Sequence, residues 1–232
     1  MQQHILDQLL RDRADKRAVT LATNLTTGEA RLIYPKPGAA DEIEQQALAA
    51  LREDKPRTVE TSEGAIFINA FNPPLRLLIV GAVHIAQPLA QMAAMTGYDV
   101  TIIDPRRAFA TADRFPGVTL LGDWPDAGVT SLTPDTRTAV VTLTHDPKLD
   151  DAALSIALNS PCFYVGCLGS KKTHAARLAR LALAGFDDTA MARIHGPVGL
   201  SIGAKSPAEI AVSIMAQLTA VLRQGHGQGK AQ

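Results

Sequence analysis

The sequence predicts an α/β protein with a doubly wound, mainly parallel sheet, preceded by a small α+β domain. Three observations support this fold class. Residues 76–104 have the pattern of a strand, a glycine turn, a helix and a second strand. Apolar runs over 118–121, 138–144 and 163–166 then alternate with helical patterns, as expected for a parallel sheet. The region before these residues instead shows strand pairs around short turns, together with two helical patterns.

The N-terminal region, residues 1–72, is expected to form the small α+β domain. Helices are predicted over 3–15 and 41–53, and strands over 18–23, 31–34, 57–60 and 65–71. Consecutive prolines at Pro73 and Pro74 then stop both a helix and a central strand. We therefore expect a domain boundary here, with the second domain over 73–232.

The second domain opens with a βαβ unit. Residues 76–80 are an apolar run that suits a strand buried on both faces. Gly81 follows at once and allows a sharp turn. An apolar helical stripe over 85–97 leads into a second buried strand over 98–103, which Asp104 closes. Such a unit aims a helix N-terminus, with its free N–H groups, at an anionic ligand.

The turn after the first strand matches the dinucleotide-binding fingerprint G-x-G-x-x-G/A only in part. Gly81 and Ala86 fit, but Val83 replaces the second glycine, and its branched side chain should hinder close approach of a pyrophosphate. Asp104 follows the turn by about 20 residues, where a carboxylate can accept a hydrogen bond from a ribose hydroxyl. The residues therefore predict a Rossmann-like fold, and they leave open whether NAD(P) binds.

The remaining elements follow in order. The basic turn around Arg106 suits a phosphate, a solvated loop or an ion pair with a nearby carboxylate. A loop carries Trp124, and Asp146 with Pro147 should begin a helix. Another helix is expected from Gly169 to about residue 184, then a short strand over 193–195. A capping box over 206–209, with Pro at its first helical position, should begin the last helix.

Polar residues gather where the predicted strands end, which is the edge of an open α/β sheet that binds ligands. Besides the Gly81 turn with His84, Asp104 and Arg106, two further clusters lie there. One is Thr144, His145 and Asp146, in which His145 could hydrogen-bond a ligand or transfer a proton, while Asp146 suits a helix cap. The other is Gly169, Ser170, Lys171 and Lys172, which suits an anionic ligand but equally a capped helix with solvated lysines.

Composition narrows the function classes. Lys+Arg and Asp+Glu both number 23, and this balance argues against electrostatic binding to nucleic acid or to an anionic membrane. The apolar runs are too short to span a bilayer and the N-terminus does not resemble a signal peptide, so a cytoplasmic location is expected. The histidines lack zinc-site spacing, so no metal site is expected. Cys162 and Cys167 are expected to be core thiols, with Cys167 a weaker candidate for a sulfur or metal ligand.

Several longer stretches resemble one known family. They are LLIVGAVHIAQPLA, DPRRAFATADRFPG, VVTLTHDPKLDDAAL, and VGCLGSKKTHAARL followed by RIHGPVGLSIGAKSPAEIAVSIMAQL. Together they make the region from about Pro74 to Leu222 similar to the C-terminal Rossmann domain of the xanthine dehydrogenase accessory family (XdhC/CoxI).

This resemblance implies an accessory protein, rather than an enzyme, that helps to mature a molybdenum hydroxylase of the xanthine dehydrogenase or CO dehydrogenase type. It implies binding of the molybdenum cofactor, help with its sulfuration or insertion, and an apo molybdenum hydroxylase as partner. A cysteine desulfurase and a second copy of the chain are further candidate partners. By motif position, the residues on the ligand side are Gly81, Val83, His84, Asp104, Arg106, Thr144, His145, Gly169, Ser170 and Lys171.

The sequence also departs from that family. Longer members carry a glycine-cysteine segment in their N-terminal part, whereas residues 1–72 contain no cysteine. Val83 stands where many members have glycine. Two alternatives therefore stay open: an NAD(P)-dependent oxidoreductase, and a non-catalytic protein that docks on the dehydrogenase. The cofactor hypothesis requires the Gly81 turn and the Lys171 bend to converge on one anionic ligand.

Overall fold

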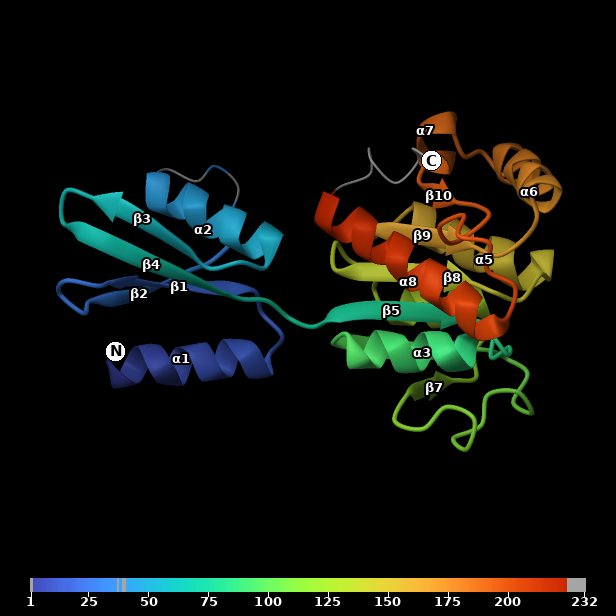
Figure 1. Ribbon diagram of the computed structural model, residues 1–232, viewed down its shortest axis with the longest axis horizontal. Helices are drawn as coiled ribbons and strands as arrows, with labels where there is room; N and C mark the ends of the chain where they lie inside the picture. Colours follow the sequence, from blue (N-terminus) through green and yellow to red (C-terminus); the bar gives the residue numbers. More distant parts are fainter. Residues whose placement is uncertain (1, 37, 39–40, 225–232) are drawn as a thin grey trace. The chain divides into compact units, whose positions relative to one another are not determined.

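The computed structural model describes residues 2–36, 38 and 41–224, and it divides into two compact units between Pro74 and Leu75 (Figure 1). Each unit has its own sheet. No hydrogen-bonded strand pair joins the two sheets within the described residues.

The first unit is a four-stranded antiparallel sheet in the order β2-β1-β4-β3 with two helices. Its apolar core lies between the sheet and α2, where Ala47 and Ala50 of the helix are buried together with Ile68 of β4. Asp41 begins α2 by accepting a hydrogen bond from the backbone N–H of Glu44. The elements confirm the predicted α+β pattern: α1 Gln3–Ala14, β1 Val19–Asn24, β2 Ala30–Ile33, α2 Glu42–Glu53, β3 Arg57–Thr61 and β4 Gly64–Phe71.

The second unit contains a six-stranded sheet in the order β10-β9-β8-β5-β6-β7, and every neighbouring pair is parallel. The strand order reverses between β5 and β8, so the chain winds outward from the middle of the sheet in both directions. This confirms the Rossmann-like, doubly wound sheet that the sequence predicts. The strands are β5 Leu75–Val80, β6 Tyr98–Ile103, β7 Thr119–Leu121, β8 Thr138–Thr142, β9 Tyr164–Cys167 and β10 Ile194–His195.

Helices cover both faces of this sheet, as Figure 1 shows. Successive residues of β5 point to opposite faces, so Leu77 and Ile79 join one core while Leu78 and Val80 join the other. The first core contains α3 (Ala86–Met95) and α8 (Pro207–Gln224). The second core contains α4 (Pro125–Ser131), α5 (Pro147–Leu158) and α6 (Lys171–Leu183).

Most predicted helix ends are confirmed. The Asp146 side chain accepts a hydrogen bond from the backbone N–H of Lys148, with Pro147 in the first turn of α5. Ser206 and Glu209 exchange the hydrogen bonds of a capping box at α8.

Two short helices are not among the predicted elements. The predicted loop over 122–125 ends in the first turn of α4, because Pro125 occupies an N-terminal helical position that tolerates proline. The other is α7 (Asp188–Met191), a single turn capped by Asp187.

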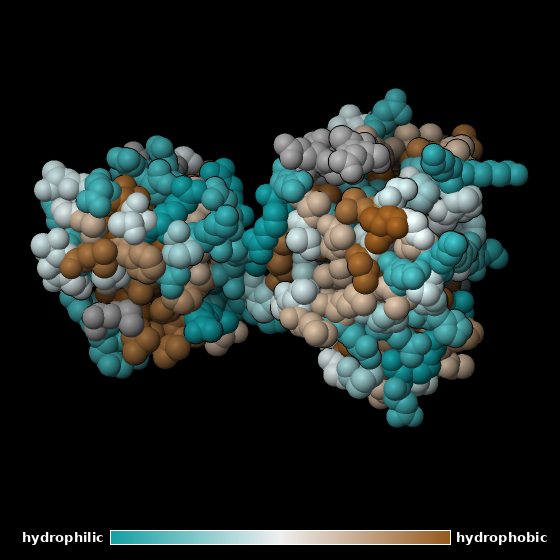
Figure 2. Space-filling view, in the orientation of Figure 1, coloured by the Kyte–Doolittle hydropathy of each residue, from teal (hydrophilic) through white to brown (hydrophobic). Residues whose placement is uncertain are grey.

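The surface of the second unit is mixed in character. Figure 2 shows an apolar area on the face where α8 lies in Figure 1, surrounded by hydrophilic residues. A shallow groove between α3 and α8 is lined by Met92, Thr96, Val212, Met215, Ala216 and Thr219. Among the described residues, no helix combines the length and the apolar character that crossing a membrane requires.

Candidate functional site

The reversal of strand order puts the turn after β5 next to the bend after β8. Gly81 has a φ of 108°, which favours glycine, and a Cβ at this position would lie 2.7 Å from Cγ2 of Thr144. The two bends are therefore in direct contact, and only a residue without a side chain fits between them. The chain leaves β5 for α3 on one face and leaves β8 for α5 on the other, and open α/β sheets bind ligands where the strand order switches in this way.

The N-terminus of α3 faces this edge of the sheet. Its first turn receives no side-chain cap, because the N-cap residue Ile85 offers no acceptor. The backbone N–H groups at this helix N-terminus are therefore suited to donate hydrogen bonds to an anionic ligand. Val83 is half-buried against the first core, and His84 is exposed.

Asp104, at the end of β6, is bound by the chain itself. Its Oδ2 accepts hydrogen bonds from the backbone N–H of Ala82 and from Nη2 of Arg106, both at 2.8 Å. Its Oδ1 accepts from the backbone N–H and from Nε of Arg106, both at 2.9 Å. Burial raises the pKa of this carboxyl, but these hydrogen bonds outweigh it and leave the pKa below its ordinary value.

These hydrogen bonds occupy the carboxylate that the sequence suggests for a ribose hydroxyl. With both carboxylate oxygens engaged, a ribose hydroxyl can bind Asp104 only by displacing a protein donor. The sequence allows Arg106 a phosphate, a solvated loop or an ion pair, and the structure shows the ion pair, with Asp104. The guanidinium remains 39% exposed at the side-chain level beside the glycine turn, so it presents a fixed positive charge there.

A buried network holds the bend after β8. Thr144 donates to Oδ1 of Asp150 from its hydroxyl at 2.7 Å and from its backbone N–H at 3.2 Å. His145 follows with a φ of 63° and an exposed side chain, so the predicted ligand contact of His145 is sterically accessible. Burial raises the pKa of the Asp150 carboxyl above its ordinary value, although the hydrogen bonds from Thr144 act in the opposite direction.

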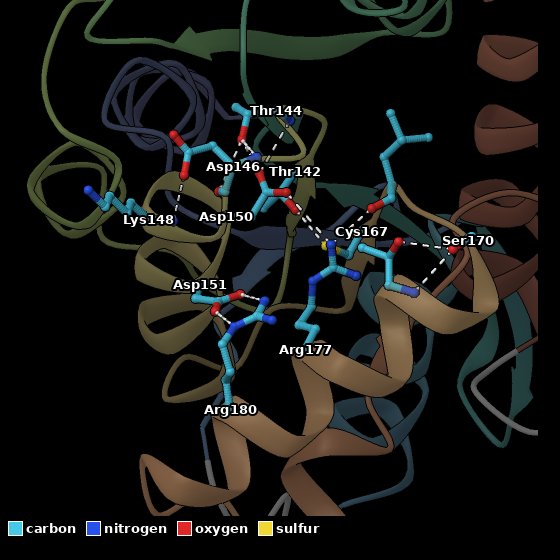
Figure 3. Close-up of polar contacts among 12 residues, drawn as sticks. Thr142, Thr144, Asp146, Lys148, Asp150, Asp151, Cys167, Ser170, Arg177 and Arg180 are labelled. Atoms are coloured by element: carbon cyan, nitrogen blue, oxygen red, sulfur yellow. Dashed lines mark hydrogen bonds and ion pairs between the residues drawn. The ribbon is translucent and has the colours of Figure 1, made fainter.

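Arg177 of α6 links this network to the bend after β9 (Figure 3). Its Nη2 donates to the carbonyl oxygen of Leu168 at 2.9 Å and lies 3.7 Å from Oδ2 of Asp150. Arg177 and Asp150 are 2% and 1% exposed, so this ion pair is fully inside the protein. The pair therefore fixes the Thr144 bend and the Gly169 bend relative to each other.

Neither member of that pair was predicted as part of the site. A signal was present, because both charges interrupt apolar helix faces: Asp150 precedes Ala153 and Leu154 on α5, and Arg177 precedes Leu181 on α6. A charge at such a position requires a partner inside the protein.

The bend after β9 has the two features that the sequence predicts, a glycine turn and a helix cap. Gly169 has a φ of 148°, and the Ser170 side chain accepts a hydrogen bond from the backbone N–H of Thr173 at 3.1 Å. The Ser170 hydroxyl therefore caps α6, whereas Lys171 and Lys172 are exposed. In the sheet, β8 alone separates β9 from β5. The Gly169 bend and the Gly81 turn therefore lie at one edge of the sheet, separated by two strand spacings, or roughly 10 Å.

The two cysteines are core thiols, as predicted. Cys167 is 0% exposed and its sulfur lies 2.8 Å from Oγ1 of Thr142. Burial raises the pKa of Cys162 to about 11 and that of Cys167 to about 12, so both remain protonated at neutral pH. Within the part of the chain that the structure describes, no cluster of His, Cys, Asp and Glu could hold a metal ion.

Comparison with known proteins assigns this arrangement to a family. Residues 77–218, more than half of the chain, match the family model described as the XdhC Rossmann domain. The chain belongs to the XdhC family. The matched region contains the Gly81 turn, the Asp104–Arg106 pair and both later bends, so the whole carboxyl edge lies inside the XdhC domain.

Three curated proteins and one crystal structure extend this comparison. The Escherichia coli K12 protein YqeB is 30% identical over 198 residues, covering 79% of this chain and 37% of YqeB. The molybdenum cofactor insertion chaperone PaoD, also from E. coli K12, is 31% identical over 208 residues, covering 85% of this chain and 58% of PaoD. A probable xanthine dehydrogenase subunit of Bacillus subtilis 168 is 34% identical over 154 residues, covering 66% of this chain and 44% of that protein.

The crystal structure is that of a xanthine dehydrogenase from Bacillus halodurans, with a TM-score of 0.70 and 25% identity over 99% of this chain and 66% of that chain. The chain thus spans 37% to 58% of the length of the three curated relatives that it matches.

Replacing Asp104 by Asn is expected to destabilise the fold by about 1–3 kcal/mol at neutral pH, since it weakens charge-assisted hydrogen bonds to Arg106. The folded-state pKa of Asp104 is lowered, so its stabilisation is present above the unfolded pKa of about 3.9 and is lost as the pH falls through the folded value. Urea unfolding of the wild type and of Asp104→Asn at pH 7 and pH 3 measures both effects.

The difference in unfolding free energy between these two proteins should shrink at pH 3. The exposed Asp113 provides a control, because Asp113→Asn should unfold like the wild type at both pH values. An equal difference at the two pH values would show that the Asp104 charge does not stabilise the turn.

Proposed function

We propose that this chain binds the molybdenum cofactor at the carboxyl edge of its parallel sheet and delivers it to an apo molybdenum hydroxylase. The observation that carries the proposal is the switch in strand order between β5 and β8, where the Gly81 turn and the Thr144 bend meet inside an XdhC domain. The name of the relative PaoD, a molybdenum cofactor insertion chaperone, supports the cargo. The chain would act as an accessory protein and not as an enzyme.

The edge has the chemistry that this cargo needs. The cofactor is a pterin with an anionic phosphate, and a phosphate is bound well by a helix N-terminus with nearby cations. The N-termini of α3 and α6 approach the same edge from opposite faces of the sheet. Arg106 provides a positive charge at the first N-terminus, and Lys171 and Lys172 provide charges at the second.

The family resemblance also implies help with sulfuration of the cofactor, for which a reactive thiol would be one possible sulfur carrier. Cys162 and Cys167 lie inside the second unit, and burial keeps them protonated, so neither is suited to carry sulfur to a ligand. Residues 1–72 contain no cysteine. We therefore propose that any sulfur inserted into the bound cofactor comes from a separate donor such as a cysteine desulfurase. A homodimer stays a prediction.

Purification from cells that make the cofactor tests the cargo directly. The wild type should retain bound pterin and molybdenum. The double change Lys171→Ala and Lys172→Ala should lower both contents about tenfold, because two exposed cations beside the phosphate are lost. The melting temperature should not change, since neither side chain is buried.

Lys55→Ala serves as a matched control, because Lys55 is exposed and belongs to the other unit. It should leave the pterin and molybdenum contents unchanged. Absence of both pterin and molybdenum from the wild type would remove the proposed cargo. Full content in the double variant would remove the lysines from the site.

The order of the parallel strands favours a second candidate function, binding of NAD(P) by an oxidoreductase. Val83 stands at the position where glycine lets a pyrophosphate approach the backbone. Val83→Gly should therefore tighten binding of NAD(H) or NADP(H), which calorimetric titration measures. The oxidoreductase alternative loses its support if neither nucleotide binds the wild type below about millimolar, which corresponds to roughly −4 kcal/mol, and Val83→Gly changes nothing.

A further inference from the structure

The groove between α3 and α8 lies on a face of the second unit that the proposed cargo does not occupy. It has a volume of about 370 Å³, and its lining is mostly apolar, with Met92, Val212 and Met215 in its walls. Val212 is 46% exposed, although its side chain is apolar. Figure 2 shows this apolar area within a hydrophilic surround. An apolar centre with a polar rim is typical of a protein–protein interface.

α8 reaches the surface along one narrow stripe. Most of the helix packs into the second unit, and its buried residues are Ala211, Ser213, Ile214, Met215, Gln217, Leu218 and Val221. The stripe consists of Glu209, Val212, Ala216, Thr219 and Arg223. Successive members are three, four, three and four residues apart, which is the spacing of a seam between two packed helices. The outer side of α8 therefore has the pattern of a helix-packing surface.

The stripe is complementary to a reversed copy of itself. Glu209 lies seven residues before Ala216 and Arg223 lies seven residues after it, so each charge is about 10 Å from Ala216 along the helix. Two copies of α8 that pack antiparallel about a two-fold axis at Ala216 therefore bring Glu209 of each copy beside Arg223 of the other. Both ends of such a helix pair join opposite charges.

We propose that the α8 stripe and the groove beside it form the interface of a homodimer with two-fold symmetry. Ala216 on the axis allows the two helices to approach closely, because its side chain is a single methyl group. Val212 of each copy lies opposite Thr219 of the other, at the groove that both residues line. Opposite charges at equal distances from one central residue favour a second copy of this chain over an unrelated protein, because self-pairing requires that symmetry.

The antiparallel arrangement keeps the two carboxyl edges apart. α8 begins at the side of the second unit where the parallel strands end, as Figure 1 shows. In an antiparallel pair of helices of 18 residues, the two α8 N-termini are separated by about 27 Å along the helix direction. Each copy therefore keeps its own ligand edge open. The interface does not depend on the identity of the cargo, and only the expectation of one cargo per copy rests on the proposed function.

Disulfide cross-linking tests the position of the axis. Ala216→Cys should give a disulfide-linked dimer after mild oxidation with diamide, because the axis brings the two introduced thiols within reach of each other. Cys162 and Cys167 are buried and should not react. Ala208→Cys is the matched control, because Ala208 is exposed on the same helix but lies about 24 Å from its counterpart along the helix direction. It should remain uncross-linked.

Sedimentation velocity measures the dissociation constant of the dimer, and the wild type should have twice the mass of the chain at micromolar concentration. Val212→Asp should abolish the dimer, since a carboxylate would lose its hydration at the groove. Arg223→Glu should weaken the dimer about tenfold, because each end of the helix pair then joins two carboxylates. Combining it with Glu209→Arg should restore the wild-type constant, although the capping box of α8 is lost.

Arg52→Glu is the matched control for the charge change, because Arg52 is an exposed arginine in the last turn of α2, in the first unit. It should leave the dissociation constant unchanged. A wild type that stays monomeric at every concentration would overturn the inference. A dimer that survives Val212→Asp, or that Ala216→Cys does not cross-link, would also overturn it.

Failure of the charge exchange between Glu209 and Arg223 to restore the dimer would overturn the antiparallel register. The pterin and molybdenum contents of the wild type are measured independently of its mass. A monomer that retains both would overturn the interface and leave the proposed function intact. A cross-linked dimer without either would support the interface and remove the proposed cargo.

Discussion

The geometry of the carboxyl edge depends on one buried carboxylate. Asp150 accepts two hydrogen bonds from Thr144, and Thr144 is the residue that contacts the Gly81 turn. The same carboxylate lies beside Arg177, which holds the carbonyl group before the Gly169 bend. Removing one partner of a buried ion pair costs about 3–5 kcal/mol, because the other charge is left inside the protein. A pair of this kind fixes the two bends more rigidly than exposed contacts between loops would.

The rest of the edge follows from the parallel sheet. Because all six strands run in one direction, every strand leads its following bend to the same side of the second unit. The reversal of order between β5 and β8 then separates the helices that follow these strands onto opposite faces of the sheet. Arg106 and the two lysines add charge to an arrangement that the backbone has already produced.

The sequence predicts most of this fold because the strands are short apolar runs and the glycines mark their ends. The pattern also places the predicted ligand-side residues at the carboxyl edge of the sheet, since strand ends in a parallel sheet coincide. It misses the interactions that join distant segments. Asp150 and Arg177 belong to different helices, and their pairing depends on how α5 and α6 pack against the sheet. Arg106 is two residues from Asp104 in the sequence. Only the structure shows that the Arg106 side chain folds back and donates hydrogen bonds to the Asp104 carboxylate.

In the proposed complex, the phosphate of one anionic cargo binds at the edge between the Gly81 turn and the Lys171 bend. A crystal structure of the protein purified with its cofactor would locate that phosphate. We expect phosphate density within hydrogen-bonding distance of the backbone at the N-terminus of α3 or α6, with Arg106 or Lys171 beside it. Density for the cofactor in the first unit, or in the groove between α3 and α8, would contradict it.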